Sequence, residues 1–288
     1  MKRPLGLSTF VLASPFSDSA AIEAFERTAA FGYDLIEVCI EDPALVTADA
    51  LLSNAERTGL AVGICGAFGP DRDLSHPDAD VRDRGLTYVR DCIDLAAAVG
   101  SPHVAGPMYA PTGQTRLLEK PEREAQLNRA ADTLARAAEY GAARGVALAI
   151  EPLNRFETDL VNTVEQALDL CDRIGDPSAG LLIDTFHMNI EEKRLGDAVR
   201  LAGDRVRHVQ VSENDRGTPG SGHVPWDEFF DALDDIDYRG QIVVESFLPT
   251  VREIARAVSL WRPVAESMDA LAQDGIAFLR ERFPRSAS

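Results

Sequence analysis

Eight short apolar runs alternate with segments of helical periodicity along the chain, and this alternation restricts the possible folds more than any other feature. The runs lie at residues 5–11, 34–40, 60–68, 102–107, 146–152, 180–186, 206–213 and 241–247. Between them, apolar residues recur at three-and-four spacing, as in "EREAQLNRAADTLARAAEYGAARG", and several such segments end on glycine, as helices often do. Strand and helix alternating eight times over 288 residues predict an α/β chain folded as a (β/α)8 barrel.

An open doubly wound sheet is the main alternative to the barrel. Sheets of that kind that bind dinucleotides carry a GxGxxG motif after the first strand, and this chain has none there. No linker or low-complexity stretch divides the chain, and a hydrophobic content of 45% is enough for one large core. We therefore expect a single barrel domain over residues 1–288.

The charge of the chain argues against several classes of partner. Its formal net charge is -18, and a field of this sign repels nucleic acid and anionic membrane surfaces, so a small neutral molecule is the expected ligand. No apolar stretch approaches the ~20 residues of a membrane-spanning helix, and the first residues lack a signal-peptide pattern. The four cysteines form no CxxC pair and are expected to be reduced and buried. Together these features predict a cytoplasmic protein.

Three of the apolar runs carry an acid at or near their carboxyl end. These acids are Glu151 in "VALAIEP", Asp184 in "GLLIDTF" and Glu245 in "QIVVESF". In a (β/α)8 barrel the active site lies at the carboxyl ends of the strands, so the three acids should meet at one mouth. Carboxylates that converge in this way repel one another unless a cation neutralises them. We therefore expect a divalent metal ion.

The seventh run, "RHVQVSEND", is expected to supply a further ligand. Side chains alternate along a strand, so Val209 and Val211 should face the helices while His208 and Gln210 face the barrel interior, with Gln210 nearer the mouth. Either polar residue could bind metal. An oxygen-rich set that includes Gln210 would select a hard ion such as Mn2+ or Mg2+.

Four motifs, "IEPLNRFET", "LLIDTFHMNIEE", "HVQVSENDRG" and "IVVESF", resemble those of the D-tagatose 3-epimerase and D-psicose (allulose) 3-epimerase family. This family lies within the xylose-isomerase-like TIM barrels, the sugar phosphate isomerase/epimerase group. The resemblance implies a divalent metal, Mn2+ in the first place with Mg2+ or Co2+ as alternatives. Its expected ligands are Glu151, Asp184, Gln210 and Glu245.

Position 210 is where the chain departs from the family pattern, because the epimerases carry a histidine there. An amide oxygen also binds these ions, and hydroxypyruvate isomerase, a relative in the same superfamily, is similar in using glutamine. The resemblance further implies that Glu157, His187 and Arg216 bind the oxygens next to the reacting carbon. His187 is expected in a loop just beyond Asp184.

The expected activity is that of a metal-dependent carbohydrate epimerase, an isomerase that interconverts free ketohexoses or related ketoses. Proton transfer at carbon 3 would pass through an enediolate, with Glu151 and Glu245 exchanging the roles of base and acid and Asp184 acting only as a ligand. The resemblance also implies a homodimer or homotetramer.

Several alternatives stay open on the sequence. The same metal barrel could catalyse aldose-ketose or hydroxypyruvate-type isomerisation, or epimerise a keto-glycoside. A DNA-repair endonuclease would need a histidine-rich cluster and a basic track, and five scattered histidines with a charge of -18 do not favour it. A non-catalytic sugar-binding barrel would not need all of the acids. For single residues, the strand-end acids could cap helices, and Gln210 could be a hydrogen-bonded core amide.

Overall fold

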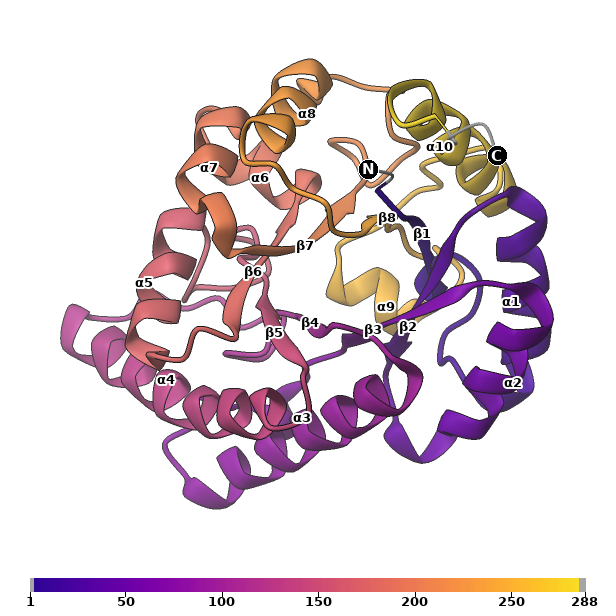
Figure 1. Cartoon of the computed structure of the whole chain (residues 1–288). Helices are drawn as coiled ribbons and strands as arrows, with labels where there is room; N and C mark the ends of the chain where they lie inside the picture. Colours follow the sequence, from indigo (N-terminus) through magenta and orange to yellow (C-terminus); the bar gives the residue numbers. More distant parts are fainter. Residues whose placement is uncertain (1–2, 285–288) are drawn as a thin grey trace.

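Eight parallel strands close into a barrel in the order of the sequence, with the eighth strand paired to the first (Figure 1). The computed structural model describes residues 3–284, except for the side chain of Glu253. The predicted (β/α)8 barrel is confirmed, and each strand begins within one residue of the start of one of the eight apolar runs. The strands are β1 Leu5–Ser8, β2 Leu35–Ile40, β3 Ala61–Gly66, β4 His103–Gly106, β5 Ala147–Ile150, β6 Ala179–Asp184, β7 Val206–Val211 and β8 Ile242–Val244.

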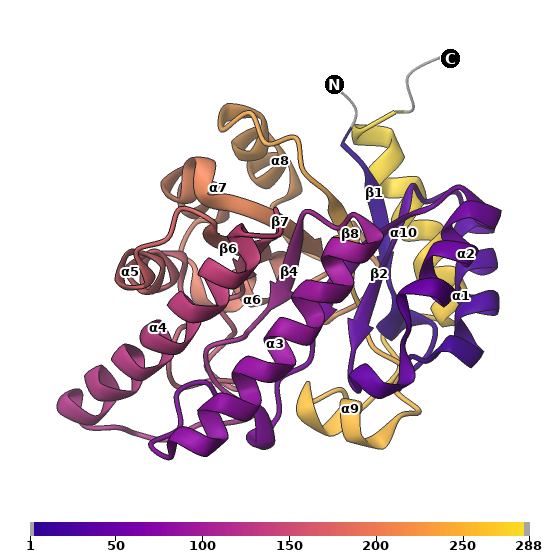
Figure 2. The same ribbon diagram turned by 60° about the horizontal axis from the view of Figure 1, so that its bottom comes forward.

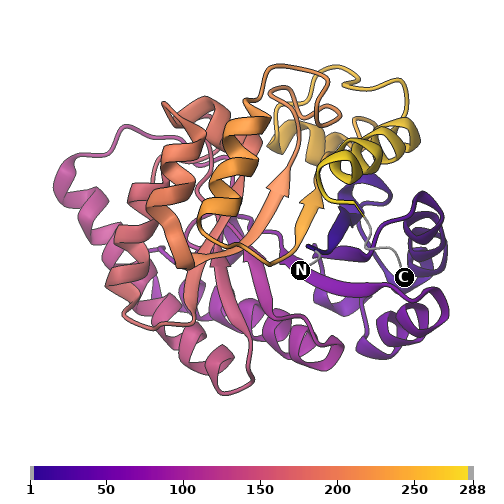
Figure 3. The same cartoon turned by 45° about the horizontal axis from the view of Figure 1, so that its top comes forward.

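Helices surround the barrel in the segments where the sequence has three-and-four periodicity. They are α1 Asp18–Phe31, α2 Ala48–Thr58, α3 Ala79–Val99, α4 Lys120–Ala142, α5 Val164–Ile174, α6 Thr185–Glu191, α7 Leu195–Ala202, α8 Trp226–Asp235, α9 Arg252–Ala257 and α10 Met268–Arg282. Short 3-10 turns lie at Thr9–Val11, Pro43–Leu45, Pro70–Arg72 and Gly203–Arg205. The last helix, α10, contacts α1 and β1 and so completes the outer ring (Figure 3).

Local signals set the ends of several helices. Thr163 and Gln166 form a reciprocal capping box at the start of α5, which satisfies backbone N–H groups that have no partner inside the helix. At the other end, Gly175 adopts a left-handed conformation with φ 72°, where a residue with a side chain would be strained. The stop at Gly175 keeps the connection from α5 to β6 short, so that β6 begins at Ala179.

The strands are buried on both faces because helices cover the outside and side chains fill the inside. β2 is buried along its whole length, and this includes the charged residue Glu37. Inside the barrel, Cys39, Cys65, Ala105 and Ala149 come from neighbouring strands at matched positions and belong to one small apolar cluster. Small side chains at this level leave room for the larger polar groups of the mouth.

One helix lies at the mouth instead of in the outer ring. Figure 2 shows α9 below the carboxyl ends of the strands. Its residues Ile254 and Ala257, together with Val258 directly after it, line the cavity there. No helix within residues 3–284 is long and apolar enough to cross a membrane.

Candidate metal centre and active site

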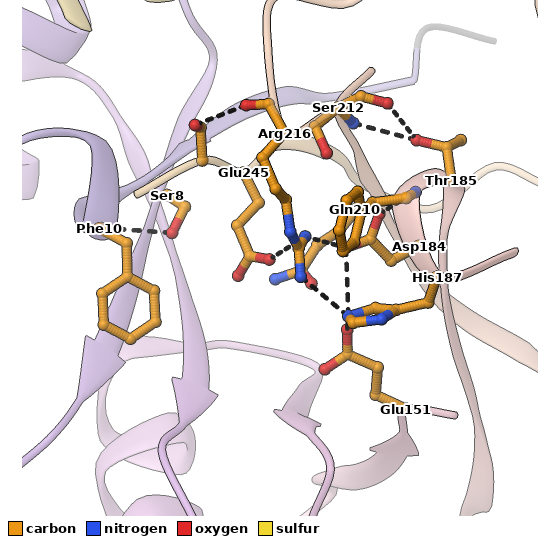
Figure 4. A network of polar contacts seen from close by, with 12 residues as sticks. Ser8, Phe10, Glu151, Asp184, Thr185, His187, Gln210, Ser212, Arg216 and Glu245 are labelled. Carbon is orange, nitrogen blue, oxygen red and sulfur yellow. Dashed lines mark hydrogen bonds and ion pairs between the residues drawn. The ribbon is translucent and has the colours of Figure 1, made fainter. Parts of the chain in front are cut away.

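The three acids predicted at strand ends meet at the mouth of the barrel. Glu151 follows β5 directly, Asp184 is the last residue of β6, and Glu245 follows β8 directly. All three are buried, with at most 5% of the residue exposed. A cavity of about 310 Å³ opens beside them, and the predicted site residues that line it are Glu151, Glu157, His187, Arg216 and Glu245. Figure 4 shows Glu151, Asp184, His187, Arg216 and Glu245 pointing toward one another.

Distances within this group are those of a site that can hold an ion. One potential ligand atom from each of Glu151, Asp184 and His187 lies within 4.8 Å of the other two. Glu245 joins the group through Arg216, whose Nη1 donates to Asp184 Oδ2 at 2.6 Å and to Glu245 Oε2 at 3.1 Å. The Arg216 guanidinium therefore places positive charge between two carboxyl groups.

His187 lies on helix α6 and not in the expected loop. Asp184 is the last residue of β6 and also the cap of α6, so the helix follows the strand without a connection. The Asp184 carboxylate accepts a hydrogen bond from the Phe186 backbone N–H at 2.8 Å, which caps α6. The rigid first turn of α6 then fixes the His187 ring over the acids. His187 therefore lies beside Glu151 and Asp184, in a more rigid setting than the expected loop.

The hydrogen bonds of His187 determine which ring nitrogen faces the cavity as a donor. Nδ1 faces two donors of Asn154, the backbone N–H at 3.0 Å and Nδ2 at 2.9 Å, whereas Nε2 faces one, Arg216 Nη2 at 2.9 Å. The neutral ring therefore accepts more hydrogen bonds with its proton on Nε2. Burial, and then the positive charge of Arg216, hold the pKa of His187 well below its usual value, which keeps the ring neutral. A protonated Nε2, 3.5 Å from Glu151 Oε1, can donate to an oxygen but has no lone pair for a metal. This favours substrate binding over metal ligation by His187.

Asn154 also positions Glu157. Its side-chain Nδ2 donates to Glu157 Oε1 at 2.9 Å, so one residue orients two predicted substrate-binding groups. Burial raises the pKa of Glu157, while Arg216 and Asn154 lower it. Asn154 was not among the predicted site residues, although it lies three positions before Glu157 in the same motif.

Arg216 reaches the acids from an unusual backbone conformation. Its φ of 68° is left-handed, which is uncommon for a residue with a side chain, and Ser246 Oγ holds it by donating to the Arg216 carbonyl at 2.7 Å. The guanidinium packs 4.0 Å from the centre of the Phe186 ring. Such a strained residue persists only where its surroundings fix it, which is typical of functional sites.

The segment that carries Arg216 is held by Glu213, a fully buried acid that the sequence analysis did not single out. The Glu213 carboxylate accepts hydrogen bonds from the backbone N–H of Gly220 at 2.9 Å and of Val224 at 3.2 Å, and from Trp226 Nε1 at 2.6 Å. One carboxylate thus ties both ends of the 213–226 segment together. Its neighbour Ser212 directly follows β7, and nothing in the motif indicated this role for Glu213.

Gln210 faces the barrel interior, as the alternation along the seventh strand predicted, and it pairs with Asp184 in the β6–β7 register. Its Nε2 donates to Glu37 Oε1 at 2.6 Å. Its Oε1 is buried and has no hydrogen-bond partner within residues 3–284. A buried carbonyl oxygen without a partner is costly, so this atom is available for a cation.

The electrostatics of the acids also fit a bound cation. Burial, reinforced by Glu245 and Asp184, raises the pKa of Glu151 well above its usual value. Burial raises the pKa of Glu245 to about 8, although Arg216 lowers it. Three carboxylates and one unpaired amide oxygen form an all-oxygen donor set, which suits a hard divalent ion. The residues present therefore fit a divalent metal.

These pKa shifts predict how the stability of the metal-free protein depends on pH. Folding raises the pKa of Glu245 from about 4.5 to about 8, so the folded protein holds a proton that the unfolded chain has lost. Stability should therefore fall as the pH rises through this range. The buried His103 and His187 have lowered pKa values and act in the opposite direction, but only below about pH 6.5, where the unfolded rings become charged.

The test is the melting temperature in EDTA between pH 7 and pH 8.5, which should fall. Glu245→Gln should flatten this slope because the variant lacks the titrating group. A melting temperature of wild type that stays level or rises over this interval would contradict the expectation.

The fold and the site define a (β/α)8 barrel with a buried, acid-rich candidate metal centre at the carboxyl ends of its strands. The family model described as "Xylose isomerase-like TIM barrel" matches residues 25–282. The chain is 33% identical to a probable ketose 3-epimerase of Synechocystis sp., covering 98% of this chain and 97% of the relative. It is 34% identical to the L-ribulose 3-epimerase of Mesorhizobium japonicum, covering 96% and 92%.

A crystal structure of the D-allulose 3-epimerase from Methylomonas sp. in complex with D-allulose superimposes with a TM-score of 0.91 at 29% identity, covering 98% of each chain. The chain therefore belongs to the xylose isomerase-like TIM barrel family and, within it, to the ketose 3-epimerases. This confirms the resemblance that the four motifs carried.

Proposed function

We propose that this protein is a divalent-metal-dependent ketose 3-epimerase that interconverts free ketohexoses or related ketoses through an enediolate. One observation carries the proposal: two buried carboxyl groups with raised pKa values, Glu151 and Glu245, line the same cavity from different strands. Epimerisation next to a ketone needs one group to remove a proton from one face of the carbon and another to return a proton to the opposite face. Two such acids can do this when one is ionised and the other is protonated.

The metal would be held by Glu151, Asp184, Gln210 and Glu245, with Mn2+ as the expected ion and Mg2+ or Co2+ as alternatives. When bound, it would polarise the carbonyl and stabilise the negative charge of the enediolate. Asp184 does not line the cavity and caps α6, which suits a ligand without a role in proton transfer.

Proton transfer is assigned to the two glutamates. β5 and β8 are separated by two strands in the barrel, so Glu151 and Glu245 approach a sugar in the cavity from different sides. In one direction Glu151 removes the proton at carbon 3 and Glu245 returns one to the other face, and in the reverse direction the roles exchange. Burial helps both residues because it brings their pKa values toward the working pH.

The remaining polar groups of the cavity would hold the oxygens around the reacting carbon. His187 Nε2–H and the Arg216 guanidinium can donate hydrogen bonds to the oxygen that gains negative charge. Glu157, oriented by Asn154, can accept one from a hydroxyl. These three assignments are proposals that rest on the placement of the side chains in one cavity.

The cavity lining favours an unphosphorylated sugar. Besides Arg216, the arginine that lines it is Arg72, which donates to the backbone carbonyls of Ala67 and Glu41 at 3.0 and 2.7 Å and lies 4.1 Å from the centre of the Tyr88 ring. Both guanidinium groups are thus already engaged, and acids dominate the rest of the charged lining. A phosphate dianion would find no free cation among the described lining residues.

The test is proton NMR of the purified protein with Mn2+ in deuterium oxide, against fructose, psicose, tagatose, sorbose and ribulose. Deuterium should enter at carbon 3 together with the appearance of the epimer. Exchange confined to carbon 1 would replace the proposal by an aldose-ketose or hydroxypyruvate-type isomerase. No exchange with any of these ketoses would reject the proposed substrate class and direct the search to keto-glycosides.

The proposal also includes a homodimer or homotetramer located in the cytoplasm, as the family resemblance and the sequence composition suggest. Light scattering after size-exclusion chromatography tests the first point, and a single species at the monomer mass of 31.2 kDa would reject it.

A further inference from the structure

A further carboxylate, outside the three proposed for the candidate metal centre, lies deeper in the barrel and contacts one of the proposed metal ligands. Glu37 is on β2 and is fully buried inside the barrel. Its Oε1 accepts the 2.6 Å hydrogen bond from Gln210 Nε2, and its Oε2 lies 2.5 Å from His208 Nε2. Gln210 and His208 are both on β7, so one carboxylate from β2 serves two side chains on a strand that is not its neighbour in the barrel.

The chemistry of the two groups determines which way the amide faces. A carboxylate only accepts hydrogen bonds, whereas an amide side chain donates through its nitrogen and accepts through its oxygen. Only the nitrogen of Gln210 can therefore face Glu37 favourably. The amide oxygen is then turned away from Glu37, and this is the buried Oε1 that has no partner among the described residues.

An amide at this position needs such control because its two ends have nearly the same shape. A 180° flip would exchange the oxygen and the NH2 group of Gln210, so that a donor in place of an acceptor would occupy the position of the unpartnered Oε1. The flipped state would also set the amide oxygen against the Glu37 carboxylate. Glu37 thus disfavours the state that cannot bind a cation.

We propose that Glu37 is a positioning residue that holds the Gln210 amide with its oxygen directed to the divalent metal. The inference rests on the metal-dependent function proposed above. A merely structural role for Glu37, such as partnering His208 in the core, would affect folding but would not act through Gln210. If Glu37 positions Gln210, a change of Glu37 should affect Mn2+ affinity only while Gln210 is present. If its role is merely structural, the effect should not depend on residue 210.

The experiment is a thermodynamic cycle of Mn2+ affinity, measured by calorimetry on protein stripped of metal. Glu37→Gln should weaken Mn2+ binding by about 10- to 100-fold, because the new amide can present either its nitrogen or its oxygen to Gln210. Glu37→Gln should change the affinity little in a Gln210→Ala background, where no amide remains to be oriented. Each variant is also checked for its metal-free melting temperature.

Glu192→Gln is the matched control. Glu192 is a partly buried acid that accepts the backbone N–H of Val164 at 2.7 Å and does not line the cavity, so the same change of charge there should leave Mn2+ affinity unaltered.

A reversed pair gives an independent test if Glu37→Gln alone does not fold. The double variant Glu37→Gln with Gln210→Glu restores the hydrogen bond with donor and acceptor exchanged, and leaves one carboxylate oxygen for the metal. It should bind Mn2+ more tightly than Glu37→Gln or, if that variant is unfolded, than Gln210→Ala.

Three results would overturn the inference. They are unchanged Mn2+ affinity in Glu37→Gln, an equal loss in the Gln210→Ala background, and a folded reversed pair that does not regain binding. If wild type binds no divalent ion at all, the metal-dependent function fails together with the inference. If wild type binds Mn2+ tightly and one of the three results is obtained, only the role of Glu37 is rejected and the metal-dependent function stands.

Discussion

Replacing Glu151 or Glu245 with glutamine should give a folded protein that no longer interconverts the epimers. Glutamine keeps the shape of the side chain but cannot accept or return a proton, and the loss of one acid–base group costs about 100- to 10,000-fold in rate. Because each acid is also a proposed metal ligand, we expect turnover to become undetectable. The fold should persist, since burial raises the pKa of both groups and the neutral amide removes a costly charge.

Deuterium exchange separates the loss of a base from the loss of the metal. In a two-base mechanism each variant keeps one base, so it should exchange the proton at carbon 3 of one epimer with solvent without forming the other epimer. Glu151→Gln and Glu245→Gln should do so with opposite epimers. Metal content, measured by mass spectrometry, is compared with that of wild type. Turnover within a few-fold of wild type in either variant would reject the assignment.

The second large effect concerns Arg216 in the metal-free protein. Arg216→Met should lower the free energy of unfolding in EDTA by about 3–5 kcal/mol, because the change leaves the buried Asp184 carboxylate, and Glu245 wherever it is ionised, without a counter-ion. In saturating Mn2+ the difference from wild type should become much smaller, since the ion supplies the missing positive charge. Urea unfolding with EDTA and with Mn2+ measures both values.

Arg216 acts on the acids through its positive charge, which a metal cation can replace, and not through its contact with His187. Its Nη2 lies 2.9 Å from His187 Nε2, which carries the ring proton when Nδ1 accepts the Asn154 backbone N–H, so two donors face each other. That contact does not hold the guanidinium in place. Arg216→Lys, which keeps the charge, serves as the control and should lose less stability in EDTA. An equal destabilisation of Arg216→Met with and without Mn2+ would contradict this account.

Much of the candidate site could be predicted because it follows from position along the strands. Glu151, Asp184 and Glu245 each lie at the end of an apolar run, and the carboxyl ends of parallel strands in a barrel meet at one face. The inward direction of Gln210 followed from the alternation of side chains along a strand. His187 was expected near Asp184 but in a loop, because no sequence signal indicates that Asp184 both ends a strand and caps a helix.

The residues that orient the site were not predictable in the same way. Glu37 is the one charged residue in the run "LIEVCI", which could have drawn attention to it, but its partner Gln210 is 173 positions away. Glu213 gathers N–H groups from a segment that folds back on itself, and Asn154 acts on His187 from another strand end. Each of these contacts joins segments whose distance in space cannot be read from their distance along the chain.

The amino-acid sequence by itself therefore determined the barrel, the acids at its mouth and the family to which the chain belongs, because periodicity and strand-end position are local properties. Only the tertiary structure decided that Arg216 bridges Asp184 and Glu245, and that Glu37 directs the Gln210 amide. The reason is physical: hydrogen bonds and ion pairs depend on distances of about 3 Å between side chains from different strands, and these distances exist only once the barrel has closed.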